Sequence, residues 1–172
     1  MSELKRTQLY DVHVAAGATM VDFGGWEMPI KYPTDIVAEH LYTRHFCSLF
    51  DVSHMGRVLV EGEDAVPFLQ HVLSSNALAL DVNQAQYAII PNESGGAVDD
   101  AYLYRFEADR YLLVVNAANT DKDLAHLQEQ IKAFDARMTV ITADVAAIAV
   151  QGPKAKELLM ILSGGEQITE PV

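Results

Sequence analysis

Cysteine is nearly absent from this sequence, since Cys47 is the only one among 172 residues. An intramolecular disulfide framework is therefore excluded, and a lone thiol suits a reducing compartment. No apolar run is long enough to cross a bilayer, and residues 1–6 lack the apolar core of a secretion signal. We therefore expect a cytoplasmic protein that does not act at a membrane.

Basic residues are also scarce. The chain has 12 Lys and Arg against 24 Asp and Glu, which gives a formal net charge of -12. Non-specific nucleic-acid binding depends on Lys and Arg, so we expect no nucleic-acid partner. His40 and His45 have no third ligand at metal spacing, and one nearby cysteine does not make a zinc site, so we also expect no metal.

Residues 57–142 contain a regular succession of strand and helix patterns. Strands are predicted at 57–62, 86–90, 97–106, 110–116 and 137–142, and helices at 63–73 and 119–134. Asn119 or Thr120 is predicted to cap the second helix, with an acid three residues on as in a capping box. Helices against a mostly antiparallel sheet define an α+β fold, here a ferredoxin-like variant with one extra strand.

The segments on either side of this unit have no partner within it. Residues 8–17 predict a short helix with Leu9, Val12 and Val14 facing a core. A strand over 143–151 and a helix reaching Leu162 follow the unit. We therefore expect residues 1–52 and 143–172 to belong to one discontinuous and incomplete first domain, into which 53–142 is inserted.

Residues 87–104 hold a carboxylate in an unusual place. Pro91–Gly96 is a turn by composition, and the strand after it alternates with period two. Asp100 therefore shares a face with Tyr102 and Tyr104, whereas Asp99 lies on the other face. A carboxylate on an aromatic face indicates a site that binds a ligand or moves a proton. The alternative is the solvated start of a strand.

Ser53 and His54 do not predict a hydrolase. Neighbouring residues on an extended chain point to opposite faces, and the Gly-x-Ser-x-Gly nucleophile elbow does not occur in the sequence.

Five motifs stand in the order found in one protein family. They are MVDFGGWEMP (20–29), FDVSHMG (50–56), GGAVDD (95–100), LVVNAAN (113–119) and VQGPKA (150–155). Together they make the chain resemble the N-terminal part of the glycine cleavage system T protein family, which are aminomethyltransferases. Members of this family are longer, so the C-terminal part of the parent protein would be absent here.

The resemblance implies a function and a site. T proteins take the aminomethyl group from the lipoyl arm of the H protein, pass its methylene to tetrahydrofolate and release ammonia. It implies Asp100 as the catalytic residue, with Met55, Tyr87 and Asn116 binding tetrahydrofolate. An arginine, a glutamate and a tyrosine of the family's site would lie beyond Val172, so we expect this chain alone to be inactive.

Three other readings remain open. The first is a folate-binding module without transferase activity, like the relatives involved in tRNA modification or iron–sulfur maintenance. The second is the folate domain of a sarcosine- or dimethylglycine-oxidising flavoenzyme, which would need an attached flavin domain. The third is a purely structural interaction protein.

Overall fold

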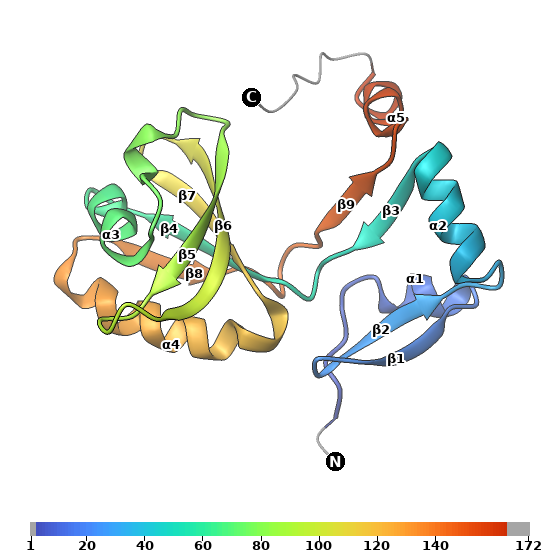
Figure 1. The fold of residues 1–172 in the computed structure, drawn as a ribbon, viewed down its shortest axis with the longest axis horizontal. Coiled ribbons are helices and arrows are strands. Elements are labelled where there is room, and N and C mark those ends of the chain that lie inside the picture. The colour runs from blue at the N-terminus through green and yellow to red at the C-terminus, as the bar shows by residue number, and fades with distance from the viewer. Residues whose placement is uncertain (1–2, 165–172) are drawn as a thin grey trace. The chain divides into compact units, whose positions relative to one another are not determined.

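The chain divides into two compact units in this computed structural model, which describes residues 3–164 (Figure 1). Within the described residues, unit 1 holds residues 3–54 and 145–164, and unit 2 holds Met55–Asp144. Their assignment to a discontinuous first domain and an inserted domain stays a prediction, and its residues 165–172 lie outside the described part of the chain.

Unit 2 is built on a five-stranded sheet. Its strands are β4 (Gly56–Glu61), β5 (Ala85–Pro91), β6 (Ala97–Glu107), β7 (Arg110–Val115) and β8 (Arg137–Val140). Their order across the sheet is β5-β6-β7-β4-β8, and every neighbouring pair is antiparallel. The chain order β, α, β-β-β, α, β is the predicted one, and the α+β fold with antiparallel sheets and flanking helices is confirmed.

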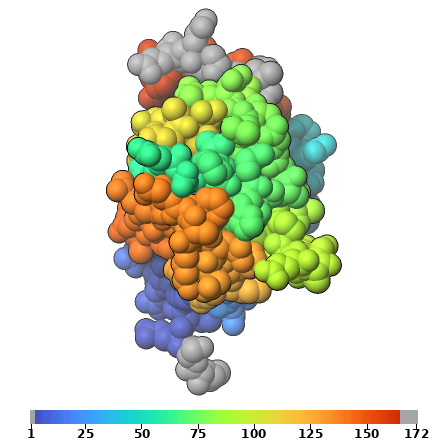
Figure 2. Space-filling model, turned by 90° about the vertical axis from the view of Figure 1, so that its left-hand side faces the viewer, coloured from blue at the N-terminus to red at the C-terminus, as the bar shows by residue number. Residues whose placement is uncertain are grey.

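Helices cover one face of this sheet. They are α3 (Ala65–Val72), α4 (Thr120–Gln130) and the short 3₁₀ helices η1 (Ala77–Ala79), η2 (Ala117–Asn119) and η3 (Ile131–Ala133). Figure 2 shows one side of this unit, where α3 and the segment from α4 to β8 lie at the surface. Val60, Leu103 and Leu113 from the strands pack there against Phe68 and Leu127 from the helices, all of them fully buried. Alternation along each strand sends these side chains to the helices, and burial of this apolar area stabilises the unit.

The other face of the sheet, which we call the open face, carries large aromatic side chains. Tyr102, Tyr104 and Phe106 of β6 are each about two-fifths exposed there, and the Tyr102 and Tyr104 rings lie 5.2 Å apart between centroids. These rings give the open face an exposed aromatic surface.

The described part of unit 1 contains two strand pairs and three α-helices. They are α1 (Tyr10–Ala15), β1 (Thr19–Phe23), β2 (Trp26–Lys31), α2 (Ile36–His45), β3 (Ser48–Asp51), β9 (Ile148–Gln151) and α5 (Ala155–Leu162). β1 pairs with β2 and β3 pairs with β9, both antiparallel. The last pair joins segments that lie on either side of unit 2 in the sequence. Within residues 3–164, no helix is both long and apolar enough to cross a membrane.

The predicted inward face of α1 is wrong. Val12 and Val14 are 62% and 48% exposed, whereas His13 is only 8% exposed. His13 faces inward because its ring makes polar contacts there. It lies within hydrogen-bond distance of the Tyr32 hydroxyl (2.8 Å) and the Asp51 carboxylate (2.9 Å).

Candidate functional site

Three of the four predicted site residues lie side by side across unit 2. The register pairs Ala101 with Val115 in β6–β7, and Gly56 with Val115 in β4–β7. Extending this register by one residue, just past the ends of β7 and β4, brings Asp100, Asn116 and Met55 opposite one another. We call these three residues the site row. Directly opposed residues share a face, so the site row belongs to the open face.

The fourth residue, Tyr87, comes from the neighbouring strand β5. Asp100 is paired with Ile89, and Tyr87 is opposite Tyr102 on the same face. Tyr87 is 58% exposed, and its hydroxyl lies within hydrogen-bonding reach of the Asp100 carboxylate. Partial desolvation, the interaction with the Asp100 side chain and the charges of Asp100 and Asp99 raise the pKa of Tyr87. The phenol therefore keeps its proton at neutral pH.

Asn116 joins the two neighbouring carboxylates. Its Nδ2 donates to Asp99 Oδ1 at 3.0 Å and to Asp100 Oδ1 at 2.9 Å. Asp99 and Asp100 point to opposite faces of β6, and one amide at the end of β7 reaches both. The amide fixes the Asp100 oxygen in direction, and leaves its other acceptor positions available to a ligand.

The helix-covered side of the sheet also carries carboxyl groups near the site row. Asp99 lies toward the helices, where Asp123 of α4 is within hydrogen-bonding reach. Burial raises the pKa of Asp99, but hydrogen bonds from the Asp100 backbone N–H, Asp123, Asn116 and Asn119 outweigh it, so this pKa lies below its ordinary value.

A single cation lies against these three carboxyls among the described residues. Lys122 Nζ is 3.9 Å from Asp123 Oδ1 and donates to the Val98 carbonyl at 2.6 Å. The cluster therefore keeps an excess of negative charge, which favours a ligand that brings N–H donors or positive charge.

Sequence reasoning missed the role of Asp123. Asn119 occupies the N-cap position, as one of the two predicted caps, but the predicted capping box is wrong because its side chain makes no capping hydrogen bond and Asp123 is buried. The signal was present in the spacing. Asp123 stands four residues before the buried Leu127 and so falls on the inward stripe of α4.

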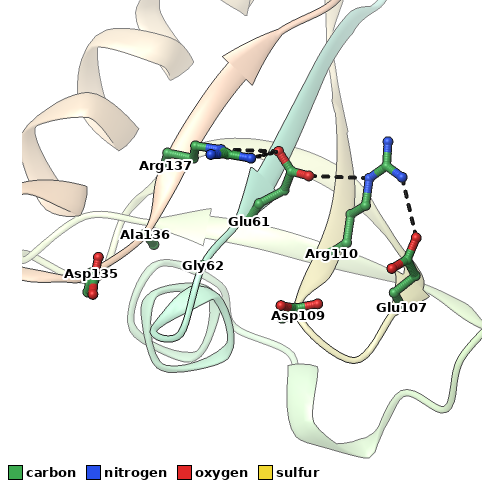
Figure 3. Close-up of a pocket in the computed structure, with 8 residues that line it drawn as sticks. All are labelled: Glu61, Gly62, Glu107, Asp109, Arg110, Asp135, Ala136 and Arg137. Carbon is green, nitrogen blue, oxygen red and sulfur yellow. Dashed lines mark hydrogen bonds and ion pairs between the residues drawn. The ribbon is translucent and has the colours of Figure 1, made fainter.

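Two hollows lie outside the site row. The first has a volume of about 470 Å³ and lies at the other end of the β4, β7 and β8 strands, where Glu61 accepts hydrogen bonds from Arg137 and forms an ion pair with Arg110 at 3.4 Å (Figure 3). The Arg110 and Arg137 charges are already paired there, and these partly exposed pairs contribute little stability. The second, about 920 Å³ and largely apolar, belongs to unit 1.

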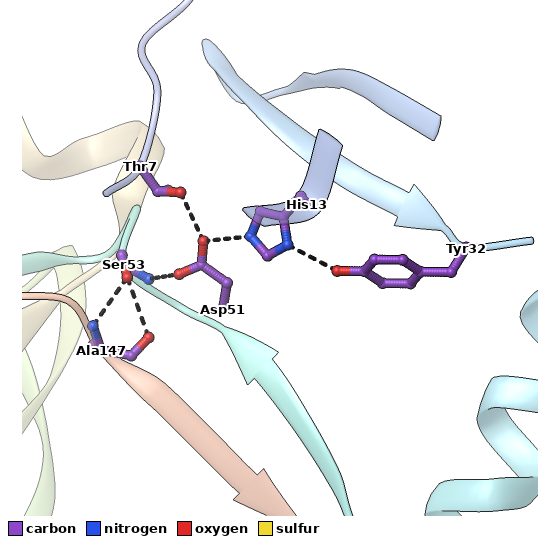
Figure 4. Close-up of polar contacts among 6 residues, drawn as sticks. All are labelled: Thr7, His13, Tyr32, Asp51, Ser53 and Ala147. Atoms are coloured by element: carbon purple, nitrogen blue, oxygen red, sulfur yellow. Dashed lines mark hydrogen bonds and ion pairs between the residues drawn. The ribbon is translucent and has the colours of Figure 1, made fainter. Parts of the chain in front are cut away.

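A polar network in unit 1 surrounds Asp51 (Figure 4). Asp51 Oδ2 accepts from Thr7 Oγ1 at 2.7 Å and lies 2.9 Å from His13 Nε2, and Oδ1 accepts from the Ser53 backbone N–H at 2.8 Å. Burial raises the pKa of Asp51, but the hydrogen bonds from His13, Ser53 and Thr7 hold it below its ordinary value. The network ties β3 to α1.

The hydroxyl of Ser53 is hydrogen-bonded to the backbone of Ala147. It accepts from the Ala147 backbone N–H at 2.9 Å and donates to the Ala147 carbonyl at 3.3 Å (Figure 4). Among residues 3–164, no group of three or more His, Cys, Asp or Glu side chains is arranged to hold a metal ion.

The fold is α+β, and the site row places the Asp100 carboxylate on the open face, where β6, β7 and β4 lie next to one another in the sheet. The family described as GCVT N-terminal domain matches residues 9–170, and the chain belongs to that family. This finding confirms the resemblance drawn from the five motifs.

Individual relatives agree. The chain is 51% identical over 156 residues to an aminomethyltransferase of Thermus thermophilus, covering 91% of this chain and 44% of that protein. It is 46% identical over 163 residues to an aminomethyltransferase of Desulfitobacterium hafniense, covering 95% and 44%. The chain thus spans less than half the length of these curated relatives.

A solved structure shows the same fold. The glycine cleavage system aminomethyltransferase T of Bartonella henselae is 37% identical and superposes with a TM-score of 0.86, covering 96% of this chain and 46% of that one. These relatives are all named aminomethyltransferases, and none supports the reading as a folate-binding module without transferase activity.

Proposed function

We propose that this chain supplies the tetrahydrofolate site of an aminomethyltransferase of glycine catabolism, with Asp100 as its catalytic residue. The observation that carries the proposal is the site row. Asp100 stands on an aromatic open face, oriented by Asn116 and Tyr87, and faces a potential ligand with unused acceptor positions. The proposal is supported by family membership and by relatives named aminomethyltransferases.

The residues suit a pterin ligand. Its ring carries several N–H donors and a flat apolar surface. Carboxylate oxygens of Asp100 would accept from the donors, and Tyr87 and Met55 would offer surfaces for the ring. The excess negative charge around Asp99 and Asp100 would favour such donors over an acceptor-rich ligand.

The reaction needs two proton movements. The carrier presents an S–CH₂–NH₂ group. When the carbon forms two bonds to folate nitrogens, the C–N and C–S bonds break, and the two folate N–H protons pass to ammonia and to the carrier sulfur. During the transfer, the methylene group carries positive charge on its carbon. Asp100 would stabilise that charge and hold the attacking nitrogen in line, and both effects are strong in a preorganised site.

The partners follow from this reaction. The aminomethyl donor is a lipoylated carrier, the H protein of the glycine cleavage system, and the acceptor is tetrahydrofolate. The cytoplasmic location stays a prediction from the single cysteine.

The test is ammonia release from an aminomethylated lipoyl carrier, with and without tetrahydrofolate, by the full-length gene product that contains this chain. We expect strong folate-dependent release, and its loss in Asp100→Asn. Asp121→Asn, which removes an exposed carboxyl from the first turn of α4, is the control and should keep the activity. Near wild-type turnover in Asp100→Asn would refute the role of Asp100. No folate-dependent release, from folded protein that binds tetrahydrofolate, would refute the transferase function.

A further inference from the structure

The Asp123 carboxyl is buried without an ordinary donor. The residue lies in the first turn of α4 and is 0% exposed. No N–H or O–H group in the described part of the chain donates to either of its oxygens. Burying a carboxylate in this way is strongly unfavourable, so the group must be neutralised.

Asp99 is the group that makes neutralisation possible. Its carboxyl lies within hydrogen-bonding reach of Asp123, and its Oδ2 is likewise buried and receives no donor from any other group among residues 3–164. Two ionised carboxylates are both acceptors and cannot bond to each other. The contact therefore requires one proton between them. Asp123 is the more buried of the two, and Asp99 already accepts from Asn116 and the Asp100 backbone N–H, so the proton belongs to Asp123.

We propose that Asp123 is a positioning residue for the folate site, because it shares one proton with Asp99 and thereby holds Asn116 and Asp100 in place. This inference rests on the proposed function for its ligand. The path is short. The Asp123 O–H donates to Asp99, Asp99 Oδ1 accepts from the Asn116 amide at 3.0 Å, and the same amide donates to Asp100 at 2.9 Å.

The groups around Asp123 place its proton loss near neutral pH. Burial, the hydrogen bond to Asp99 and the negative charges of Asp99 and Asp100 raise the pKa of Asp123 to about 7, against the opposing charge of Lys122. Above that pH, two adjacent carboxylates repel and the donor to Asp99 is lost. The site row is then held less firmly.

The experiment compares the wild type and two variants of the full-length gene product in tetrahydrofolate binding between pH 5.5 and 8.5. In the wild type, we expect affinity to fall about tenfold across this range, which is the usual effect of losing one hydrogen bond to a charged group. Asp123→Asn keeps a neutral donor at every pH, so its affinity should stay high and flat. Asp123→Leu has no donor, so its affinity should be about tenfold weaker and flat. If Asp123 had only a structural role, replacing it would change the affinity for tetrahydrofolate by the same factor at every pH.

A second readout does not depend on folate. The Asn116 side-chain amide, held between two carboxylates, should give a distinct pair of signals in ¹H–¹⁵N NMR spectra of the chain. These signals should shift near pH 7 in the wild type, stay constant in Asp123→Asn and be lost or averaged in Asp123→Leu. If the wild type binds no tetrahydrofolate but its Asn116 signals follow this pattern, the proposed function is wrong and the shared proton is supported. If Asp123→Asn keeps the wild-type pH dependence in either readout, the inference is overturned.

Discussion

Replacing Asp123 by Asn should change how the stability of unit 2 depends on pH. In the folded protein this carboxyl keeps its proton up to a pKa of about 7, whereas in the unfolded chain it releases the proton near 3.8. Between these values the native state binds more protons than the unfolded state, so the free energy of unfolding falls as pH rises. The slope is about 1.4 kcal/mol per pH unit. Over the whole window the loss is about 4 kcal/mol.

The titration of Asp99 does not contribute to the change in stability between about pH 4 and 7. Its folded pKa is lowered, so the stability it contributes is present above the unfolded value and is lost only as pH falls through the folded pKa. That range lies below pH 4. The change between about pH 4 and 7 therefore belongs to Asp123, which is fully buried and is not screened by solvent.

The assay measures the free energy of unfolding in urea at a series of pH values, and hydrogen exchange of the β6 and β7 amides is the signal that reports on unit 2. Fluorescence is unsuitable because the only tryptophan, Trp26, belongs to unit 1. Subtracting the Asp123→Asn data removes the titrations common to both proteins, and the wild type should lose about 4 kcal/mol relative to the variant from pH 4 to 7. Asp121→Asn, from the same helical turn, should keep the wild-type slope. Parallel curves for the wild type and Asp123→Asn would refute the reasoning.

Three further outcomes are expected. Gly62→Ala should destabilise unit 2 by about 3–5 kcal/mol in urea unfolding, because φ is +130° and the new Cβ would lie 2.6 Å from the Asp135 carbonyl oxygen. Gly95→Ala, at φ +84° with open space around it, should cost only about 1 kcal/mol. Equal losses in the two variants would contradict the steric argument. Leu113→Ala removes a fully buried side chain and should lower the free energy of unfolding by about 2–5 kcal/mol, with a loss below about 1 kcal/mol showing that the core is not packed there. Tyr87→Phe removes the hydroxyl that holds the site carboxylate and should weaken tetrahydrofolate binding about three- to tenfold by titration, and unchanged affinity would exclude the phenol from the site.

Unit 2 could be predicted well because its patterns are regular. Strand alternation and the helical stripes give the element order, and the face carrying Asp100 follows from period two alone. The α1 face could not be predicted in this way. Its inward residue is His13, and the contacts that turn it inward come from Tyr32 and Asp51, which are far away in the sequence.

The candidate site could likewise be predicted only in part. The motifs pointed to Asp100, Asn116, Met55 and Tyr87, and the register places the first three side by side. Asp123 could not be assigned from local pattern, since an acid in the first helical turn is usually solvated and favoured by the helix dipole. Its burial depends on how α4 lies over β6, which is a property of the tertiary structure.

The β3–β9 pair has a consequence for the order of folding. Asp51 and Ile148 are neighbours in this pair although on the order of 100 residues separate them. Closing so long a loop from the unfolded chain costs about 4 kcal/mol in entropy, whereas a loop of about ten flexible residues costs about half of that. Once unit 2 has folded on its own core, the chain between β3 and β9 behaves as the shorter loop. Unit 2 should therefore form first, and a variant that slows its folding should delay formation of the β3–β9 pair by a similar factor even when unit 1 itself is unchanged.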